Sequence, residues 1–223
     1  MMIYNTVDYP IAIEIAGKTH FMERDSELEL HLTSGTHDYR LYKADEHDGP
    51  IPAHLERASY YRHAVTVCYA ETGKLTCQRN TKVYIREDRE ELYREQYFWR
   101  HRGHAHYRTY DASVFDLTVE DGELSERRKG CLNEKVYNRM LAPYKFSFWI
   151  LGAAHLAFLI MAALIGFGVV DLHQTVGYVS VISCLFAQVV LIDTDLKKIR
   201  LLRVLQSLPV LVDVQDLMQQ DYL

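Results

Sequence analysis

The run FSFWILGAAHLAFLIMAALIGFGVV, residues 146–170, governs the interpretation of the whole chain. It contains 25 residues without Asp, Glu, Lys or Arg. As an α-helix it would be roughly 37 Å long, enough to cross the ~30 Å hydrocarbon core of a bilayer. The competing interpretation is a buried helix of a soluble bundle, but a charge-free stretch of this length exceeds what such helices show. The sequence therefore predicts a membrane span.

A second charge-free run, VGYVSVISCLFAQVVLI at residues 176–192, follows after a short link. Its 17 residues are at the lower limit for a span. Because the link is short, residues 146–192 together predict a transmembrane helical hairpin whose two ends lie on the same side of the membrane.

The flanks of this hairpin predict its orientation. Residues 127–145 contain six Lys and Arg residues and residues 193–203 contain four, whereas the link contains none. Basic residues near the ends of spans favour the cytoplasmic side. We therefore expect both termini to be cytoplasmic, in keeping with an N-terminal stretch that lacks the features of a signal peptide.

Three polar side chains inside the hairpin are candidates for a role within the membrane: His155, Cys184 and Gln188. Counted from the start of each run, His155 and Cys184 fall at similar depths, roughly 13 and 12 Å. The ordinary interpretation of His155 is a neutral ring hydrogen-bonded to a hydroxyl such as Ser180 or Ser183. The alternative is a proton or ion role, which ionisable residues in spans often have.

Residues 1–126 contain 15 Lys and Arg against 23 Asp and Glu, and predict a cytoplasmic domain of short strands. Ile11, Ile13 and Ile15 alternate with less apolar residues, which is the period of two of a half-buried strand. Turn residues such as Thr72-Gly73 separate the candidate strands. About eight to ten such strands indicate an antiparallel sandwich or barrel. The irregular segment 44–56 is interpreted as a long connection or a binding loop.

The cysteines test this interpretation of the turns. If Thr72-Gly73 is a two-residue hairpin turn, Cys68 and Cys77 face each other within disulfide distance. The expected cytoplasmic location favours free thiols, since that compartment keeps thiols reduced. The sequence leaves open whether the two are ever bridged.

Three histidines close together in the sequence, His101, His104 and His106, are weak candidates for a metal site or a His-based catalytic site. No carboxylate or thiol at a recognisable spacing completes a ligand set. The chain contains no P-loop, GxSxG, HExxH, GxGxxG or CxxC motif. We therefore assign no catalytic residue, cofactor or metal ligand, and the negative charge of the domain argues against nucleic-acid binding.

Amphipathic patterns flank the hairpin on both sides. Residues 127–145 predict a basic helix at the membrane surface that ends at Pro143. Residues 193–223 predict cytoplasmic helices, the last from about Pro209 to Tyr222. Its apolar stripe is expected to pack on the β-domain, a second copy or another protein. The stripe consists of Val210, Leu211, Val214, Leu217 and Met218.

These patterns favour an integral membrane protein whose cytoplasmic β-domain is an interaction or accessory module of a membrane complex. Membrane lipid and a protein partner or second copy are its expected partners. One alternative is a membrane-tethered enzyme with a site at His101, His104 and His106. The other is an oligomeric transporter or channel component that uses the polar residues of the hairpin.

Overall fold

The computed structural model describes residues 1–56, 67–96, 107–168 and 174–212 and divides into two compact units. The β unit comprises Met1–Asn138 and Leu208–Leu223, and the helical unit comprises Arg139–Ser207. The elements are, in chain order, β1 (Met2–Asn5), β2 (Ile11–Ile15), β3 (Lys18–Met22), β4 (Ser26–Glu29), β5 (Gly35–Lys43), η1 (Ala44–Glu46), α1 (Ala53–Glu56), β6 (Val67–Cys68), β7 (Ala70–Gln96), β8 (Tyr107–Asn133), α2 (Glu134–Gly166), α3 (Gln174–Gln206) and β9 (Val210–Val212).

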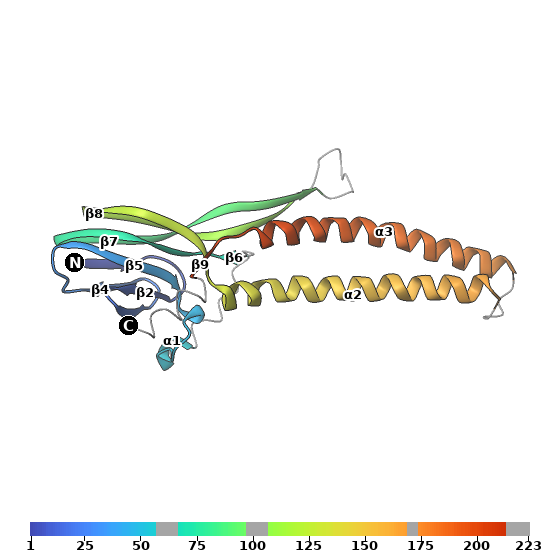
Figure 1. The fold of residues 1–223 in the computed structure, drawn as a ribbon, viewed down its shortest axis with the longest axis horizontal. Coiled ribbons are helices and arrows are strands. Elements are labelled where there is room, and N and C mark those ends of the chain that lie inside the picture. The colour runs from blue at the N-terminus through green and yellow to red at the C-terminus, as the bar shows by residue number, and fades with distance from the viewer. Residues whose placement is uncertain (57–66, 97–106, 169–173, 213–223) are drawn as a thin grey trace. The chain divides into compact units, whose positions relative to one another are not determined.

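The strands of the β unit form a nearly closed barrel (Figure 1). Their hydrogen-bonded order is β3-β2-β5-β7-β1-β4, and β4 in turn lies next to β3. β8 pairs with β7 along almost its whole length, whereas β5 pairs with an early part of β7 and β1 with a later part. The expectation of a mainly β sandwich or barrel followed by two long apolar helices is confirmed, and of the two β architectures the chain forms the barrel.

The alternation along β2 determines which face is inside the barrel. Ile11, Ile13 and Ile15 belong to the main core cluster and are almost fully buried. β2 and β3 are joined by Ala16 and Gly17, whose φ angles of 50° and 73° are those of a tight hairpin turn. This turn places Glu14, on the outer face of β2, opposite Thr19 of β3.

A second, smaller apolar cluster lies apart from the main core. It contains Ala12 of β2 and Tyr42 of β5 together with Leu132 and Val136 at the junction of β8 and α2. The side chain of Asn133 caps this junction, because the backbone N–H of Val136 donates to Asn133 Oδ1 at 2.9 Å. The first turn of α2 is therefore fixed to the barrel.

The expected turn at Thr72-Gly73 is wrong, because β7 runs without interruption through these residues. Gly73 is required for close packing instead. A Cβ atom at this position would lie 3.0 Å from the ring of Tyr39 and 3.0 Å from the carbonyl oxygen of Ser125. Several short strands expected from the sequence are thus parts of the long hairpin of β7 and β8 in Figure 1.

The register that placed Cys68 opposite Cys77 is wrong for the same reason. Cys77 is level with Gly35 on one side and Gly122 on the other. Cys68 pairs with Ser113. The four cysteines of the chain are free thiols in the structure.

The expected surface helix over residues 127–145 is also corrected. Residues 127–133 are the last part of β8, and α2 begins at Glu134 and continues through Pro143 to Gly166. A proline inside a helix removes one backbone hydrogen bond, yet membrane helices tolerate it. Residues 134–145 of the amphipathic segment and most of the apolar run that follows are therefore one helix.

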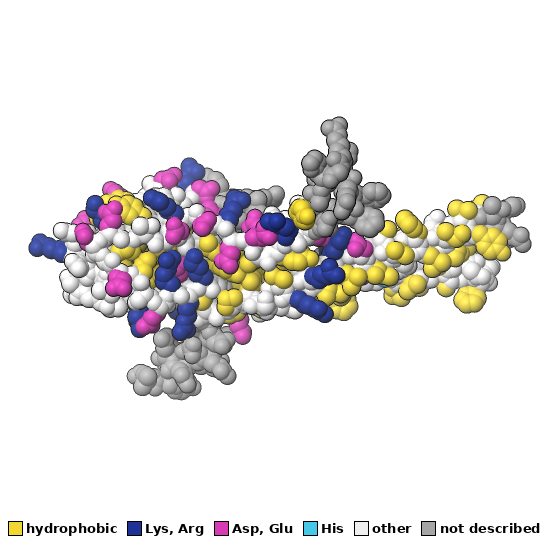
Figure 2. Space-filling view, turned by 90° about the horizontal axis from the view of Figure 1, so that it is seen from above, with side chains coloured by type: hydrophobic (Ala, Val, Ile, Leu, Met, Phe, Trp, Pro, Cys, Tyr) yellow, Lys and Arg dark blue, Asp and Glu magenta, His cyan; other side chains and the backbone are white. Residues whose placement is uncertain are grey.

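The helical unit is formed by α2 and α3, which run side by side as a hairpin (Figure 1). Both helices are long and apolar enough to cross a membrane, and the most apolar window of each is 0% buried. Trp149 and Phe167, for example, are 77% and 85% exposed. Figure 2 shows hydrophobic side chains along this unit, whereas charged side chains are spread over the β unit.

Candidate functional site

A buried carboxylate marks the most specific polar arrangement of the β unit. The side chain of Glu71 on β7 is 0% exposed. It accepts hydrogen bonds from Arg127 Nε at 2.7 Å, from Arg127 Nη2 at 3.1 Å and from the Tyr39 hydroxyl at 2.7 Å. Burial, and secondarily the hydrogen bond to Glu71, raises the pKa of the Tyr39 phenol. Bidentate pairing with Arg127 compensates the charge that burial would otherwise penalise.

A β-bulge directs Arg127 toward this carboxylate. The pairing of β7 with β8 shifts between Thr72 and Lys74, and Glu126 on the opposite strand has a φ of +53°. An extra residue in one strand changes the alternation of its side chains. Glu126 therefore pairs with Lys74 at 2.8 Å, while the next residue, Arg127, pairs with Glu71.

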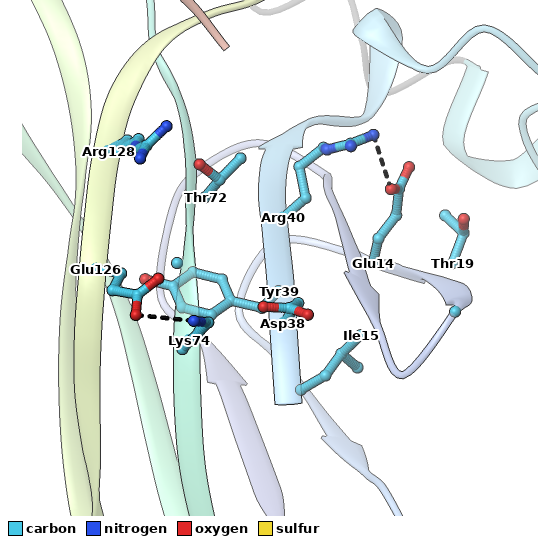
Figure 3. Close-up of a pocket in the computed structure, with 12 residues that line it drawn as sticks. Glu14, Ile15, Thr19, Asp38, Tyr39, Arg40, Thr72, Lys74, Glu126 and Arg128 are labelled. Carbon is cyan, nitrogen blue, oxygen red and sulfur yellow. Dashed lines mark hydrogen bonds and ion pairs between the residues drawn. The ribbon is translucent and has the colours of Figure 1, made fainter. Parts of the chain in front are cut away.

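Next to this network lies an open pocket of about 650 Å³ (Figure 3). Residues of β2, β3, β5, β7 and β8 line it. Arg40 Nη1 pairs with Glu14 Oε2 at 3.1 Å, and Lys74 pairs with Glu126. Figure 3 shows these two ion pairs on separate parts of the pocket, with Arg128 apart from both. The ionisable side chains of the lining are Glu14, Asp38, Tyr39, Arg40, Lys74, Glu126 and Arg128.

Two charges of the pocket are the most available for a ligand. Among the described residues the structure gives Arg128 no ion pair or hydrogen bond, and Asp38 acts on Lys74 only through its charge. The hydrogen bond and charge of Glu126, with the charge of Asp38, raise the pKa of Lys74. Within the described part of the chain, the pocket therefore offers a guanidinium and a carboxylate outside its two ion pairs, which suits a polar ligand that carries both charges.

A smaller pocket of about 120 Å³ shares Glu14 and Arg40 with the first. Here the Tyr42 hydroxyl donates to Glu14 Oε1 at 2.5 Å and lies 2.9 Å from His47 Nδ1. Arg40 Nε is buried without a hydrogen-bond partner among the described residues. Segment 44–56 forms one wall through His47 and Asp48, and Lys135 Nζ anchors Asp48 at 2.8 Å.

A second polar arrangement joins the two helices of the helical unit. His155 Nδ1 lies 2.5 Å from Gln188 Oε1, and His155 Nε2 lies 2.6 Å from Asp195 Oδ2. Gln188 Nε2 donates to the backbone carbonyl of His155 at 3.0 Å. The structure thus brings together His155 and Gln188, both expected to be polar sites within the membrane, and adds Asp195, which the sequence interpretation left outside the span.

The pairing of the helices corrects two expectations about this region. His155 contacts neither Ser180 nor Ser183 in these hydrogen bonds, and Ser183 donates to the carbonyl of Val179 instead. Cys184 does not lie at the depth of His155, because His155 is level with Gln188, one turn further along α3. One more contact, from Lys198 Nζ to Ser147 Oγ, sets the same alignment.

This alignment shortens the apolar part that the two helices share. Asp193 to Lys198 lie beside the first residues of the run that begins at Phe146. On α2 the charge-free run begins at Phe146, but its first residues lie beside the charged residues of α3. A stretch in which both helices are free of charge therefore begins only at about residue 152 of α2, opposite Ile192 of α3. The shared stretch is roughly 17 residues or about 25 Å, so His155 lies near its charged end rather than at its middle.

The expected helix over Pro209–Tyr222 is corrected where the structure describes it. Residues 210–212 form β9, which pairs in parallel with the end of β8, Cys131 with Val210. Leu211 packs on the second apolar cluster. Of the predicted stripe, Val214, Leu217 and Met218 lie outside the described residues.

The histidine candidates of the β unit, His101, His104 and His106, also lie outside the described residues. Within the described ranges no group of three or more His, Cys, Asp or Glu side chains could hold a metal ion. The arrangements found here were missed from the sequence because their members are far apart in it: Glu71 and Arg127 are 56 positions apart and His155 and Asp195 are 40.

Comparison with known proteins adds no family to this description. No family model matches the chain, and no curated protein and no solved structure shows significant similarity to it.

Proposed function

We propose that this chain is an integral membrane protein, held by the hairpin of α2 and α3, whose β unit lies in the cytoplasm and acts as an interaction or accessory module of a membrane complex. The observation that carries the proposal is the exposure of the large apolar side chains of both helices. The large apolar side chains of the barrel core, in contrast, are buried. Exposing such side chains to water costs about 25 cal/mol per Å² of apolar surface, which a lipid environment removes.

The distribution of cations supports a cytoplasmic location of both chain ends. Arg139 and Lys145 on α2 and Arg200 and Arg203 on α3 are all exposed. They flank the apolar part of the hairpin at the end where the chain enters and leaves it. Exposed cations at this position favour the cytoplasmic leaflet, where they also meet anionic headgroups.

The charged pocket supports an interaction role for the β unit. Its rim carries both signs, with Arg128 and Asp38 outside its two ion pairs. Complementary charges give specificity and orientation to a protein contact. A polar segment of a partner protein, with an acidic group for Arg128 and a basic group for Asp38, is the ligand that this rim suits.

Site-specific photo-crosslinking in native membranes tests the proposal. A photoreactive side chain at Thr19, an exposed residue of the pocket, should form a discrete crosslinked species that Arg128→Glu abolishes. The matched control is the same side chain at Glu29, which is exposed on β4 and does not line the pocket. Equal crosslinking at both positions, or a species insensitive to Arg128→Glu, would contradict the interaction role of the pocket.

A further inference from the structure

The contacts of His155 specify how many protons its site holds. The amide of Gln188 is oriented by its Nε2, which donates to the backbone carbonyl of His155 at 3.0 Å. The atom that faces His155 Nδ1 is therefore the amide oxygen Oε1. Because an amide oxygen only accepts hydrogen bonds, Nδ1 must carry a proton.

The second ring nitrogen faces another acceptor. His155 Nε2 lies 2.6 Å from Asp195 Oδ2. A neutral ring with its proton on Nδ1 has a lone pair on Nε2, and an ionised carboxylate has lone pairs only. Two such atoms form no hydrogen bond, so this contact contains one further proton, either on Nε2 of an imidazolium or on Oδ2 of a carboxylic acid. In both forms the net charge of the pair is zero.

With the Gln188 amide in this orientation, loss of that proton breaks one of the two hydrogen bonds of the His155 ring. If the remaining proton stays on Nδ1, the ring lone pair faces the carboxylate of Asp195. If it moves to Nε2, the lone pair of Nδ1 faces the oxygen of Gln188. Neither neutral tautomer satisfies both partners unless the Gln188 amide turns over, and that turn breaks its own hydrogen bond to the carbonyl of His155, so a contact between the helices is lost in every case.

After the proton is lost, the surroundings offer little compensation for the negative charge of Asp195. Asp195 Oδ1 is buried and has no hydrogen-bond partner among the described residues. Of the charged neighbours on α3, Asp193 pairs with Lys197 at 2.6 Å, and Lys198 donates to Ser147 on α2. One turn to either side of His155, α2 carries the apolar residues 151, 152, 158 and 159. A carboxylate left unpaired here is costly, as buried charges without partners generally are.

We propose that His155, Asp195 and Gln188 form a proton-binding site that fastens α2 to α3 while one proton is bound between His155 and Asp195, and that loosens this contact when the proton is lost. The site goes beyond a tethering role, because it makes the packing of the hairpin depend on pH near the charged end of the apolar stretch. It needs no metal or cofactor, and its ligand is the proton itself.

The test uses the full chain in lipid nanodiscs, with its four native cysteines replaced. Spin labels at exposed positions 149 and 196 report the spacing of the two helices. Nitrogen NMR of labelled histidine, assigned by comparison with His155→Gln, reports which ring nitrogens of His155 carry protons. Both are followed between about pH 5 and pH 10, a range that includes the ordinary titration of histidine.

The wild-type protein should show one step in label distance that coincides with loss of one proton from the His155–Asp195 pair. Asp195→Asn should remove the step, because its amide group can donate to Nε2 of a neutral ring at any pH. Asp193→Asn is the matched control: it alters a carboxylate two residues away that pairs within its own helix, and should keep the step.

Three results would overturn the proposal. The first is an unchanged spacing while the nitrogen signals of His155 titrate. The second is retention of the proton throughout the pH range, since the site would then not titrate. The third applies if Asp195→Asn separates the helices at every pH and so cannot test the step. His155→Gln then serves as the test, and the proposal predicts that this variant lacks the step in label distance. A step that persists without the imidazole ring would assign the pH response to other groups.

Discussion

Replacing Arg127 with Met removes the cation that compensates the buried carboxylate of Glu71 while retaining a long apolar side chain. Removing one partner of a buried ion pair typically costs about 3 to 5 kcal/mol. Two features reduce that figure here: the Arg127 side chain is 33% exposed, and Tyr39 still donates to Glu71. We therefore expect Arg127→Met to lower the free energy of unfolding of the β unit by about 2 to 3 kcal/mol.

The double variant Glu71→Gln/Arg127→Met should recover most of this loss, because it no longer buries an unpaired charge. Lys74→Met is the matched control, because it removes a cation that pairs across the same two strands, β7 and β8, but at an exposed position. The side chains of this ion pair with Glu126 are 40% and 63% exposed, so its loss should cost little stability.

The assay is urea unfolding of the full chain in nanodiscs, followed by pulse proteolysis of the β unit. Two results would refute the reasoning. One is a cost of Arg127→Met no larger than that of Lys74→Met. The other is a double variant no more stable than Arg127→Met alone, which would mean that the unpaired charge is not the source of the loss.

Three further predictions concern the β unit. Burial raises the pKa of the Tyr39 and Tyr42 phenols above the value of about 10 that they have in the unfolded chain. The free energy of unfolding should therefore be constant below about pH 10 and fall as the pH rises above it, because the unfolded chain then loses these protons first. Urea unfolding at increasing pH measures this dependence. Gly130→Ala should release β9, because the Cβ of the alanine would lie 2.5 Å from the carbonyl oxygen of Pro209. The substitution should destabilise the docking of β9 by about 1 to 3 kcal/mol, which faster hydrogen exchange of β9 would report. Leu211→Asp should have the same effect at a cost of about 2 kcal/mol by placing a charge against the second apolar cluster, and protection of β9 equal to wild type in either variant would contradict its docking.

The two long apolar helices and the β class of the first unit could be predicted from the sequence because each depends on a local pattern. The charge-free runs after Phe146 and Val176 exceed what a soluble helix needs, and the alternation in residues 11–15 is that of a strand with one buried face. Both patterns concern neighbours along the chain and need no knowledge of distant partners.

The predicted ends of strands and helices were wrong where one residue type occurs for two different reasons. Gly73 resembles a turn glycine in the sequence, but it is a glycine because the Tyr39 ring packs against it. Pro143 resembles a helix terminus, yet α2 continues through it. At Gly73 tertiary packing decides the outcome, and the local sequence carries no record of that packing.

The candidate sites were predictable only in part. His155 and Gln188 were identified as polar residues in apolar runs, which is a composition signal. Their partner Asp195 lies after Ile192, so the sequence interpretation placed it in the segment that follows the second span. The sequence of one helix does not show how that helix aligns with its neighbour. The network of Glu71 depends on the bulge at Glu126, which has no sequence signature.

Topology labelling tests the central claim, a membrane hairpin with the β unit in the cytoplasm, most directly. In a background without native cysteines, single cysteines replace Lys18, exposed at the start of β3, and Phe167, the 85% exposed residue after α2. A membrane-impermeant thiol reagent is applied to intact cells and to permeabilised cells. We expect position 167 to react in intact cells and position 18 to react only after permeabilisation. Reaction of position 18 in intact cells, or reaction of both positions only after permeabilisation, would contradict it.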